Sequence, residues 1–434
     1  MTSFHDDIVK RILEFTIEDA LEIQLCRNVS KQWRLLIIEW MPVLKIFIIE
    51  GYSRAKCAYA ASRGYLNVLR WAREIGCDWD ALTCACAAGN GHIEVLQWAR
   101  ANGCSWNDST CASAAFGGHL DVLKWARSNE CPWSSEICRF AAEEGHLEII
   151  QWARENGCEW DESVCSRAAA KGHLNVLQWA RLHGCLWSSL VTKCAAEQNH
   201  FYILKWAHQN GCQWHSFTSV ILAAKGNLEM LKWVKENGCP WNPDTCIIAA
   251  SEQHFDLLKW AHEQGCPSDT RLCSTLAAGG HLEMLQWARQ QGCPWDSDTC
   301  HRAARSNHLE VLKWAHANGC VWDNDTCIGA TQAGFLKTLQ WASQNGCPWE
   351  PDQCIVAAAR YGHLDIIKWI LEIGGRWSIK ICDTAVSYGY LDILLWAQHN
   401  GYSISGGAER DASLKWPNEF KLDNYKSNNI KYCY

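Results

Sequence analysis

The sequence predicts an all-α fold: an α-solenoid of about twelve to thirteen short helix-turn-helix repeats that follows a separate N-terminal module. Three observations predict it. The 434 residues include 27 Trp and 26 Cys, against only 10 Phe and 11 Tyr. Most of these Trp and Cys recur with a period of 27 residues. Each period holds two segments with helical patterning, and such units bury their apolar faces only against their neighbours.

The tryptophans form two series. The helix series consists of Trp71, Trp98, Trp125, Trp152, Trp179, Trp206, Trp233, Trp260, Trp287, Trp314, Trp341, Trp369 and Trp396. Every step in it is 27 residues, except for a step of 28 before Trp369. The turn series follows eight residues behind, from Trp79 to Trp377, and lapses only at Ser268. A fixed period of this length is typical of a solenoid.

The second half of each repeat predicts an amphipathic helix. In residues 120–128, Asp121, Lys124 and Ser128 share one face, and apolar residues cover the rest of the surface. The acid lies three residues before the base, which suits both side-chain pairing and the helix dipole. A glycine such as Gly157 then ends the helix in the left-handed conformation.

The first half of each repeat predicts a shorter helix. A cap-forming residue such as Asp80 or Asp296 precedes it, and a tight Gly turn follows it. One Cys and two Ala share a face of this helix, as in Cys111, Ala114 and Ala115, and small residues permit close approach between neighbouring helices. Two antiparallel helices per repeat therefore complete the unit of the solenoid.

These repeats resemble ankyrin repeats. The resemblance rests on the run Thr299-Cys-His-Arg-Ala-Ala followed by Asn307-His-Leu-Glu-Val-Leu-Lys313, which is similar to the Thr-Pro-Leu-His opening and Gly-His turn of that family. Ankyrin units are usually about 33 residues long. The missing residues fall between Trp295 and Thr299, so the resemblance implies an ankyrin repeat with little or no β-hairpin finger. A leucine-rich repeat also permits this period, but its alternating Leu strand and its Asn are absent.

Residues 1–40 differ from the repeats and resemble an F-box, a three-helix module. The block Val29-Ser-Lys-Gln-Trp33-Arg is the most specific part, whereas His5 and Thr16 stand where the family usually has Pro and Leu. The resemblance implies docking on the Skp-type linker of a cullin ubiquitin ligase. The residues it implies as contacts or their supports are Ile8, Ile12, Leu13, Val29 and Trp33. Alternatively, the same residues form the core of a helical cap.

Four segments are predicted: the F-box-like module at 1–40, a cap of the solenoid at 41–53, ankyrin-like repeats at 54–401, and a polar tail or cap at 402–434. An F-box-like module joined to short Trp-rich ankyrin-like repeats is similar to proteins of giant DNA viruses of amoebae. That resemblance implies a location in the host cytoplasm.

The cysteines form two further series with the same period. The Cys helix series runs from Cys57 to Cys382 and lapses at Thr192 and Ser219, and the Cys turn series runs from Cys77 to Cys347. Equivalent residues of adjacent repeats are separated by about 8 to 10 Å, whereas two ligands of one zinc lie within about 4 Å of each other. We therefore expect reduced, buried cysteines that act as small hydrophobic residues, with no metal and no cofactor. The Gly-His histidines fail the same distance test and are expected to make turn hydrogen bonds.

Composition argues against several function classes. No nucleophile triad, phosphate loop or isolated carboxylate pair is found, so we expect no enzyme. The formal net charge of −7 leaves no basic excess for nucleic acid. The most apolar stretch, 35–49, contains Glu39, Pro42 and Lys45, which excludes a membrane span. Asp6 and Asp7 replace the apolar core of a secretory signal, which favours a cytoplasmic protein.

The positions one and five residues after each Cys of the helix series vary from repeat to repeat and share one helical face. Such variation beside a repeated scaffold predicts recognition of a protein target, although neutral drift gives the same pattern. The candidate target-binding residues are Arg139, Glu143, Lys193, Glu197, His301 and Arg305. The sequence thus predicts a substrate adaptor of a cullin-type ubiquitin ligase, or alternatively a ligase-independent scaffold or inhibitor that binds a host protein.

Overall fold

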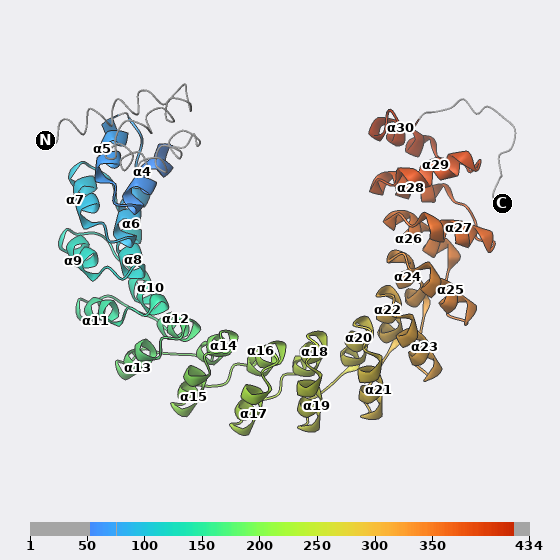
Figure 1. Cartoon of the computed structure of the whole chain (residues 1–434), viewed down its shortest axis with the longest axis horizontal. Coiled ribbons are helices and arrows are strands. Elements are labelled where there is room, and N and C mark those ends of the chain that lie inside the picture. The colour runs from blue at the N-terminus through green and yellow to red at the C-terminus, as the bar shows by residue number, and fades with distance from the viewer. Residues whose placement is uncertain (1–52, 75, 421–434) are drawn as a thin grey trace, which may run out of the picture. The chain divides into compact units, whose positions relative to one another are not determined.

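The computed structural model describes residues 53–74 and 76–420, and within them every helix or strand assigned is an α-helix. These helices, α4 to α30, confirm the predicted all-α class and the helix-turn-helix repeats (Figure 1). The chain divides into two compact units, Met1–His215 and Ser216–Tyr434. The F-box-like module at 1–40, with Ile8, Ile12, Leu13, Val29 and Trp33, lies outside the described residues, as does nearly all of the predicted cap at 41–53.

The described residues of the first unit form six helical pairs arranged in two layers. The first helices of the pairs form one layer: α4 (Ser53–Ser62), α6 (Ala81–Gly89), α8 (Asp108–Phe116), α10 (Glu136–Glu144), α12 (Ser163–Lys171) and α14 (Leu190–Glu197). The second helices form the other: α5 (Leu66–Glu74), α7 (Ile93–Ala101), α9 (Leu120–Ser128), α11 (Leu147–Glu155), α13 (Leu174–Leu182) and α15 (Phe201–Gln209).

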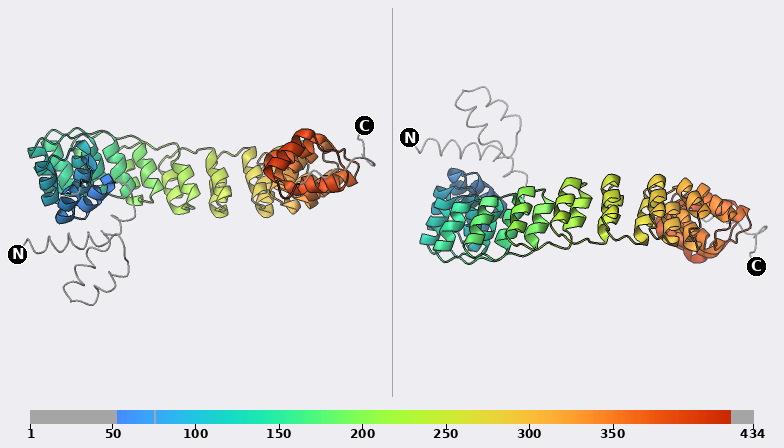
Figure 2. Two further views of the ribbon diagram at one scale, coloured as in Figure 1. Left: turned by 90° about the horizontal axis from the view of Figure 1, so that it is seen from above. Right: turned by 90° about the horizontal axis from the view of Figure 1, so that it is seen from below.

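The second unit repeats this arrangement. Its first helices are α16 (Thr218–Ala224), α18 (Asp244–Ser251), α20 (Thr270–Ala278), α22 (Ser297–Arg305), α24 (Asn324–Gln332), α26 (Pro351–Tyr361) and α28 (Ile379–Tyr388). Its second helices are α17 (Leu228–Glu236), α19 (Phe255–Glu263), α21 (Leu282–Gln290), α23 (Leu309–Ala317), α25 (Leu336–Gln344), α27 (Leu364–Glu372) and α29 (Leu391–His399). Within each unit the helices lie side by side, as the views in Figure 2 show.

Small residues make up the core of every repeat. In the pair α8 and α9, Cys111, Ala115, Val122, Leu123 and Ala126 have no exposed surface. Alanine and cysteine on the first helices leave room for neighbouring first helices to pack closely. Two adjacent buried residues on each second helix, in most repeats Val, Leu or Ile, fill the space between the layers. The prediction that the cysteines of both series are buried is confirmed for the described residues. The two half-buried cysteines, Cys86 and Cys194, belong to neither series.

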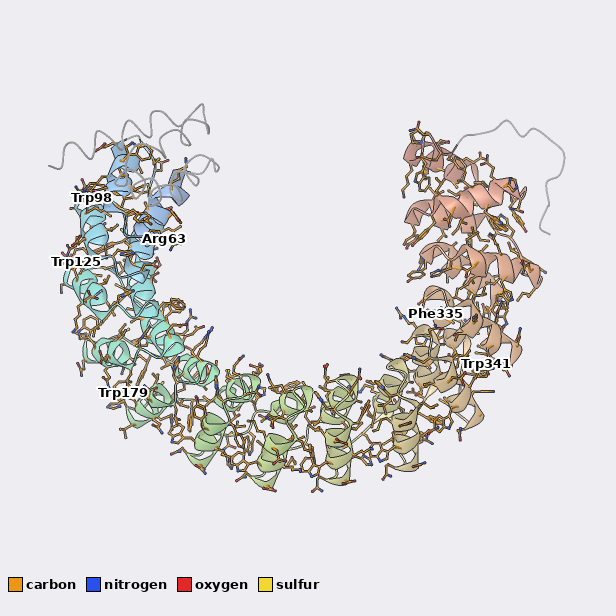
Figure 3. All side chains as sticks on the ribbon, in the orientation of Figure 1. Arg63, Trp98, Trp125, Trp179, Phe335 and Trp341 are labelled. Atoms are coloured by element: carbon orange, nitrogen blue, oxygen red, sulfur yellow. The ribbon has the colours of Figure 1, made fainter. Side chains whose placement is uncertain are left out.

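The tryptophans of the helix series are only half-buried, so they cover the core and do not form it. In most repeats the turn-series Trp meets the helix-series Trp of the next repeat edge to face, as in Trp106 and Trp125, whose ring centres lie 5.9 Å apart. Trp349 instead stacks on Trp369. Figure 3 labels Trp98, Trp125 and Trp179 on the second-helix layer of the first unit. This contact joins neighbouring repeats on the side away from the first helices.

The second helices end in a shared structure. At the end of α9, the Asn129 side-chain amide donates to the carbonyl of Trp125 at 2.8 Å. The Arg127 guanidinium donates to the carbonyl of Cys131 at 2.8 Å and lies 4.1 Å from the centre of the Trp133 ring. In most repeats a glycine follows in the left-handed conformation, such as Gly157 with φ of +82°, as the sequence predicts. The cation, the amide and the glycine together satisfy the terminal carbonyls.

The Gly-His turns connect each repeat to the one before it. The Nε2 atom of His146 donates to the carbonyl of Phe116 at 3.2 Å, and that of His173 donates to the carbonyl of Glu143 at 3.1 Å. The predicted turn hydrogen bonding is confirmed for these histidines, and its acceptor lies in the preceding repeat.

The two cysteine series contact each other, which the sequence analysis did not anticipate. The Cys273 thiol donates to the backbone carbonyl of Cys293 at 3.9 Å, and Cys293 lies 20 residues further on in the same repeat. A comparison of equivalent residues in adjacent repeats does not reveal this contact, because it joins the helix series to the turn series within one repeat.

The polar segment that follows the last full repeat begins with a helix, α30 (Gly406–Lys415), which packs against α28. The Ser405 hydroxyl accepts from the backbone N–H of Ala408 at 3.0 Å and caps this helix. The Lys415 ammonium donates to the carbonyl of Val386 at 3.1 Å and lies near Gly389, where other repeats place a His ring. Part of residues 402–434 thus forms an incomplete further repeat. Among the described helices, none is long and apolar enough to cross a membrane.

Candidate protein-binding surface

The solvent-facing side of the first helices carries the varied positions, and we call it the first-helix face. It is held in place by the buried Cys and Ala side of each first helix, which packs against its neighbours. The candidate residues Arg139, Glu143, Lys193 and Glu197 lie on this face in the first unit, on α10 and α14. His301 and Arg305 lie on it in the second unit, on α22. Within each unit, these candidate residues contact other side chains or backbone groups of the first helices.

Arg139 and Glu143 share a face of α10, as predicted, but each has another partner. The Arg139 guanidinium pairs with Glu136 one turn earlier and lies 4.8 Å from the centre of the Phe140 ring. The Glu143 carboxylate accepts from Arg167 of α12 at 3.2 Å and lies 3.9 Å from the Lys171 ammonium. Glu143 therefore connects two adjacent first helices. The two cations of α12 that contact it, Arg167 and Lys171, are about half exposed.

Lys193 and Glu197 form an ion pair within α14, with 3.6 Å between the ammonium and the carboxylate. Both side chains are more than a third exposed, so the pair contributes at most about 1 kcal/mol to stability. Its two charges remain available to a partner.

His301 and Arg305 both approach the next first helix, α24. The Nδ1 atom of His301 donates to the carbonyl of Asp325 at 2.8 Å. A Cβ added at Gly329 would lie 3.1 Å from the His301 ring and 3.3 Å from the Cβ of Arg305. The small residue of α24 thus lets both side chains lie against it.

The first unit also carries an aromatic pair and other exposed side chains that the sequence alone did not single out. Phe116 of α8, which is 48% exposed, meets Phe140 of α10 edge to face with 5.9 Å between ring centres. Leu82 of α6 is 55% exposed. The Arg63 guanidinium (Figure 3) lies 5.6 Å from the centre of the Tyr59 ring on α4. Phe116 lies five residues after Cys111, which is one of the varied positions, so an alignment of the repeats could have identified it.

On the second unit, a charged group joins α18 and α20. The Arg271 guanidinium contacts the carboxylates of Asp244 at 2.8 Å and Asp269 at 2.7 Å. The hydrogen bonds from Arg271 lower the pKa of Asp269 below its usual value. Phe217, two residues before Ser219 at the start of α16, is 46% exposed. The first-helix face therefore offers aromatic and charged side chains in both units. Ion pairs such as Glu143 with Arg167 and Asp244 with Arg271 join neighbouring first helices on it.

Nothing in the described residues gathers the donors of a multidentate metal site: no group of three or more His, Cys, Asp or Glu side chains is placed to hold a metal ion.

The sequence matches no protein-family profile. It also matches no curated protein. Among solved structures, the chain is similar to the human ASB11 ankyrin repeat domain, with 17% sequence identity and a TM-score of 0.34 over 40% of this chain and 96% of that chain. It is also similar to the pentatricopeptide repeat protein PPR10 in complex with an 18-nt psaJ RNA element, with 13% identity and a TM-score of 0.30 over 90% of this chain and 75% of that chain.

Proposed function

We propose that this chain is a protein–protein interaction protein whose first-helix face holds a protein target. One observation carries the proposal: varied side chains lie on a scaffold whose other positions repeat, and contacts such as Glu143 with Arg167 fix their orientation. Side chains that are already ordered lose less entropy when a partner binds. Exposed aromatic residues and arginines, such as Phe116 and Arg139, are the types enriched at protein interfaces.

We further propose that residues 1–40 recruit a cullin-type ubiquitin ligase, so that the target on the solenoid becomes the substrate. The resemblance of the block around Trp33 to an F-box supports this role. The implied contacts to the Skp-type linker are Ile8, Ile12, Leu13, Val29 and Trp33. The resemblance to giant-virus proteins supports a host target and action in the host cytoplasm.

A pull-down separates the two roles of the N-terminal module. The full chain and a chain lacking residues 1–40 are used as baits in host lysate, and the bound fraction is probed for a Skp-type linker and a cullin. We expect retention by the full chain alone, and loss of retention in Leu13→Glu. Equal recovery on both baits, or none on either, contradicts the adaptor role and favours a ligase-independent scaffold or inhibitor.

The target-binding surface is tested by reversing the charge of one side chain on each helical layer in separate variants. Arg139→Glu on the first-helix face should abolish capture of proteins that the wild-type chain retains. Glu148→Lys, on the exposed side of the second helix α11, is the matched control and should leave capture unchanged. If the control loses its captured proteins and Arg139→Glu keeps them, binding takes place on the second-helix layer.

A further inference from the structure

Two positions of the repeat bring neighbouring first helices into contact. One lies five residues after the Cys of a first helix, and the other lies two residues after the Cys of the next first helix. Between α8 and α10 these positions hold Phe116 and Phe140, with 5.9 Å between ring centres. Between α10 and α12 they hold Glu143 and Arg167, which donates to the carboxylate at 3.2 Å. An aromatic contact and an ionic contact therefore lie one repeat apart on the first-helix face.

Small residues occupy the same two positions on either side of these contacts. Between α6 and α8 they are Gly89 and Ser113, and a Cβ at Gly89 would lie 3.2 Å from the Cβ of Ser113. The equivalent residues of α12 and α14 are Ala170 and Cys194. The aromatic and ionic contacts are thus two large contacts between small ones.

The ionic contact presents its cations to solvent and covers its acid. The Glu143 side chain is 17% exposed, whereas those of Arg167 and Lys171, which both contact it, are about half exposed. A guanidinium has five N–H donors, and in the described part of the chain Glu143 is the one acceptor that Arg167 meets. The other donors of Arg167 and the Lys171 ammonium are therefore open to a second carboxylate. Phe116, one repeat away, is also about half exposed.

We propose that Phe116, Arg167 and Lys171 form a docking surface for an extended acidic segment of the target protein. One apolar side chain of the segment packs on the Phe116 ring, and a carboxylate pairs with Arg167 and Lys171. The inference rests on the proposed function, because it assigns a partner chemistry to the first-helix face.

Charge and spacing define this segment. A guanidinium pairs with a carboxylate through two parallel hydrogen bonds, and an apolar side chain that moves from water onto the Phe116 ring adds a favourable transfer energy. Equivalent positions of neighbouring helices lie about 8 to 10 Å apart, which is about three residues of extended chain. The acidic and apolar residues of the segment should therefore lie about two to four residues apart. A basic segment does not fit, because two cations already cover Glu143.

The probe is a phage-displayed library of random peptides, selected on the immobilised full chain. We expect the selected peptides to be rich in Asp and Glu, with an aromatic residue or Leu about two to four positions from a carboxylate. Fluorescence anisotropy then measures the affinity of one selected peptide for each variant. Arg167→Glu combined with Lys171→Glu should weaken this affinity about tenfold or more. The matched control is Arg302→Glu combined with Arg305→Glu, which reverses both cations in the last turn of α22 and should leave the affinity unchanged.

A further variant tests the apolar half of the surface. Phe116→Ser should weaken binding of the selected peptide, but not of the same peptide with its apolar residue replaced by alanine. If Arg167→Glu with Lys171→Glu fails to fold by circular dichroism, glutamine replaces glutamate at both positions. The inference is overturned by selected peptides without an acidic excess, by an unchanged affinity in the Arg167 and Lys171 variant, by an equal loss in the α22 control, or by equal effects of Phe116→Ser on both peptides.

The capture experiment with Arg139→Glu separates this inference from the proposed function. If Arg139→Glu loses the captured proteins and Arg167→Glu with Lys171→Glu keeps them, the first-helix face binds its target without the acidic segment. That result overturns the inference alone. If both variants keep the captured proteins, the first-helix face is not the binding surface, and the inference and the proposed function fail together.

Discussion

The imidazole ring of His146 lies on the α-carbon of Gly118 in the preceding repeat. A Cβ at Gly118 would lie 2.6 Å from the Cε1 atom of His146, so the contact requires glycine. Gly118 also has φ of +80°, and the ring nitrogen donates to the neighbouring carbonyl of Phe116. One small residue therefore meets a conformational requirement and makes room for the next repeat.

In several repeats, the residue at the Gly118 position and the residue at the His146 position of the next repeat change together. Where Asn199 replaces the glycine, the next repeat has Asn227 in place of the histidine. Where Asn307 replaces it, the next repeat has Phe335 (Figure 3), and the Asn307 side chain accepts from Thr338 at 3.0 Å. Two positions depart from this pattern: His281 follows Gln253, and Tyr390 follows Gly362.

Substitution of Gly118 by alanine should destabilise the solenoid through both effects. A non-glycine residue in the left-handed region costs about 1 to 3 kcal/mol, and displacement of the His146 ring adds to this. Gly157→Ala is the matched control, since its φ is +82° but a Cβ would meet nothing within 4 Å. Urea unfolding should show a larger loss for Gly118→Ala, and equal losses would contradict the contact with His146.

The tryptophans should stabilise the solenoid more than single cysteines do. Trp233 is half-buried, so Trp233→Ala should cost about 2 to 3 kcal/mol, below the ~3 to 5 of a fully buried Trp. Cys239→Ala removes a much smaller side chain and should cost about 1 kcal/mol, with Trp241→Ala between the two. Denaturant unfolding and hydrogen exchange measure these differences, and opening should begin in the middle repeats. If Trp233→Ala is as mild as Cys239→Ala, the Trp helix series is a binding surface.

Thr299→Val should be neutral or stabilising by up to about 1 kcal/mol. The Thr299 hydroxyl is buried and has no hydrogen-bond partner among the described residues, and Val164 fills the equivalent position of another repeat. Thr245→Val is the opposite case, because its hydroxyl pairs with that of buried Ser219 at 2.9 Å. This variant should lose about 1 to 2 kcal/mol in thermal unfolding. A destabilised Thr299→Val would indicate a partner such as bound water.

Stability should fall as the pH rises through the alkaline range. Burial raises the pKa of Cys239 from 9.0 to about 11 and that of Cys382 to about 12. A group whose pKa is raised by folding stabilises the native state below its unfolded pKa, and this contribution is lost as the pH rises toward the folded pKa. The urea midpoint should therefore drop between about pH 9 and 11. In Cys239→Ala this drop should be shallower, and a parallel decline would contradict the raised pKa.

We predict that the chain isolated under reducing conditions contains less than one tightly bound zinc. Thiol titration of the unfolded chain should count nearly all of its 26 cysteines as reduced. Stoichiometric zinc that survives dialysis would contradict the interpretation of the cysteines as small hydrophobic residues.

The period predicts the repeats because each helix obtains its partners from copies of itself. The period did not predict contacts between residues at different positions of the repeat. Cys273 contacts Cys293, and Glu143 pairs with Arg167, because the two residues of each pair come together only when the chain folds. The step of 28 residues before Trp369 also gave no indication of where the extra residue lies. The helix α26 before Trp369 is 11 residues long and is followed by Gly362.

The Gly-His contact also limits how such an array changes during evolution. A recombination event that removes or adds 27 residues rejoins a glycine to a histidine, so most repeats form a compatible junction wherever they are copied. At Asn307 the partner in the next repeat is Phe335 and not His, so copying a repeat across this junction would pair Asn307 with a histidine or Phe335 with a glycine. Length is therefore free to vary through the Gly-His repeats, whereas the junctions at Asn199 and Asn307 are inherited as fixed neighbours.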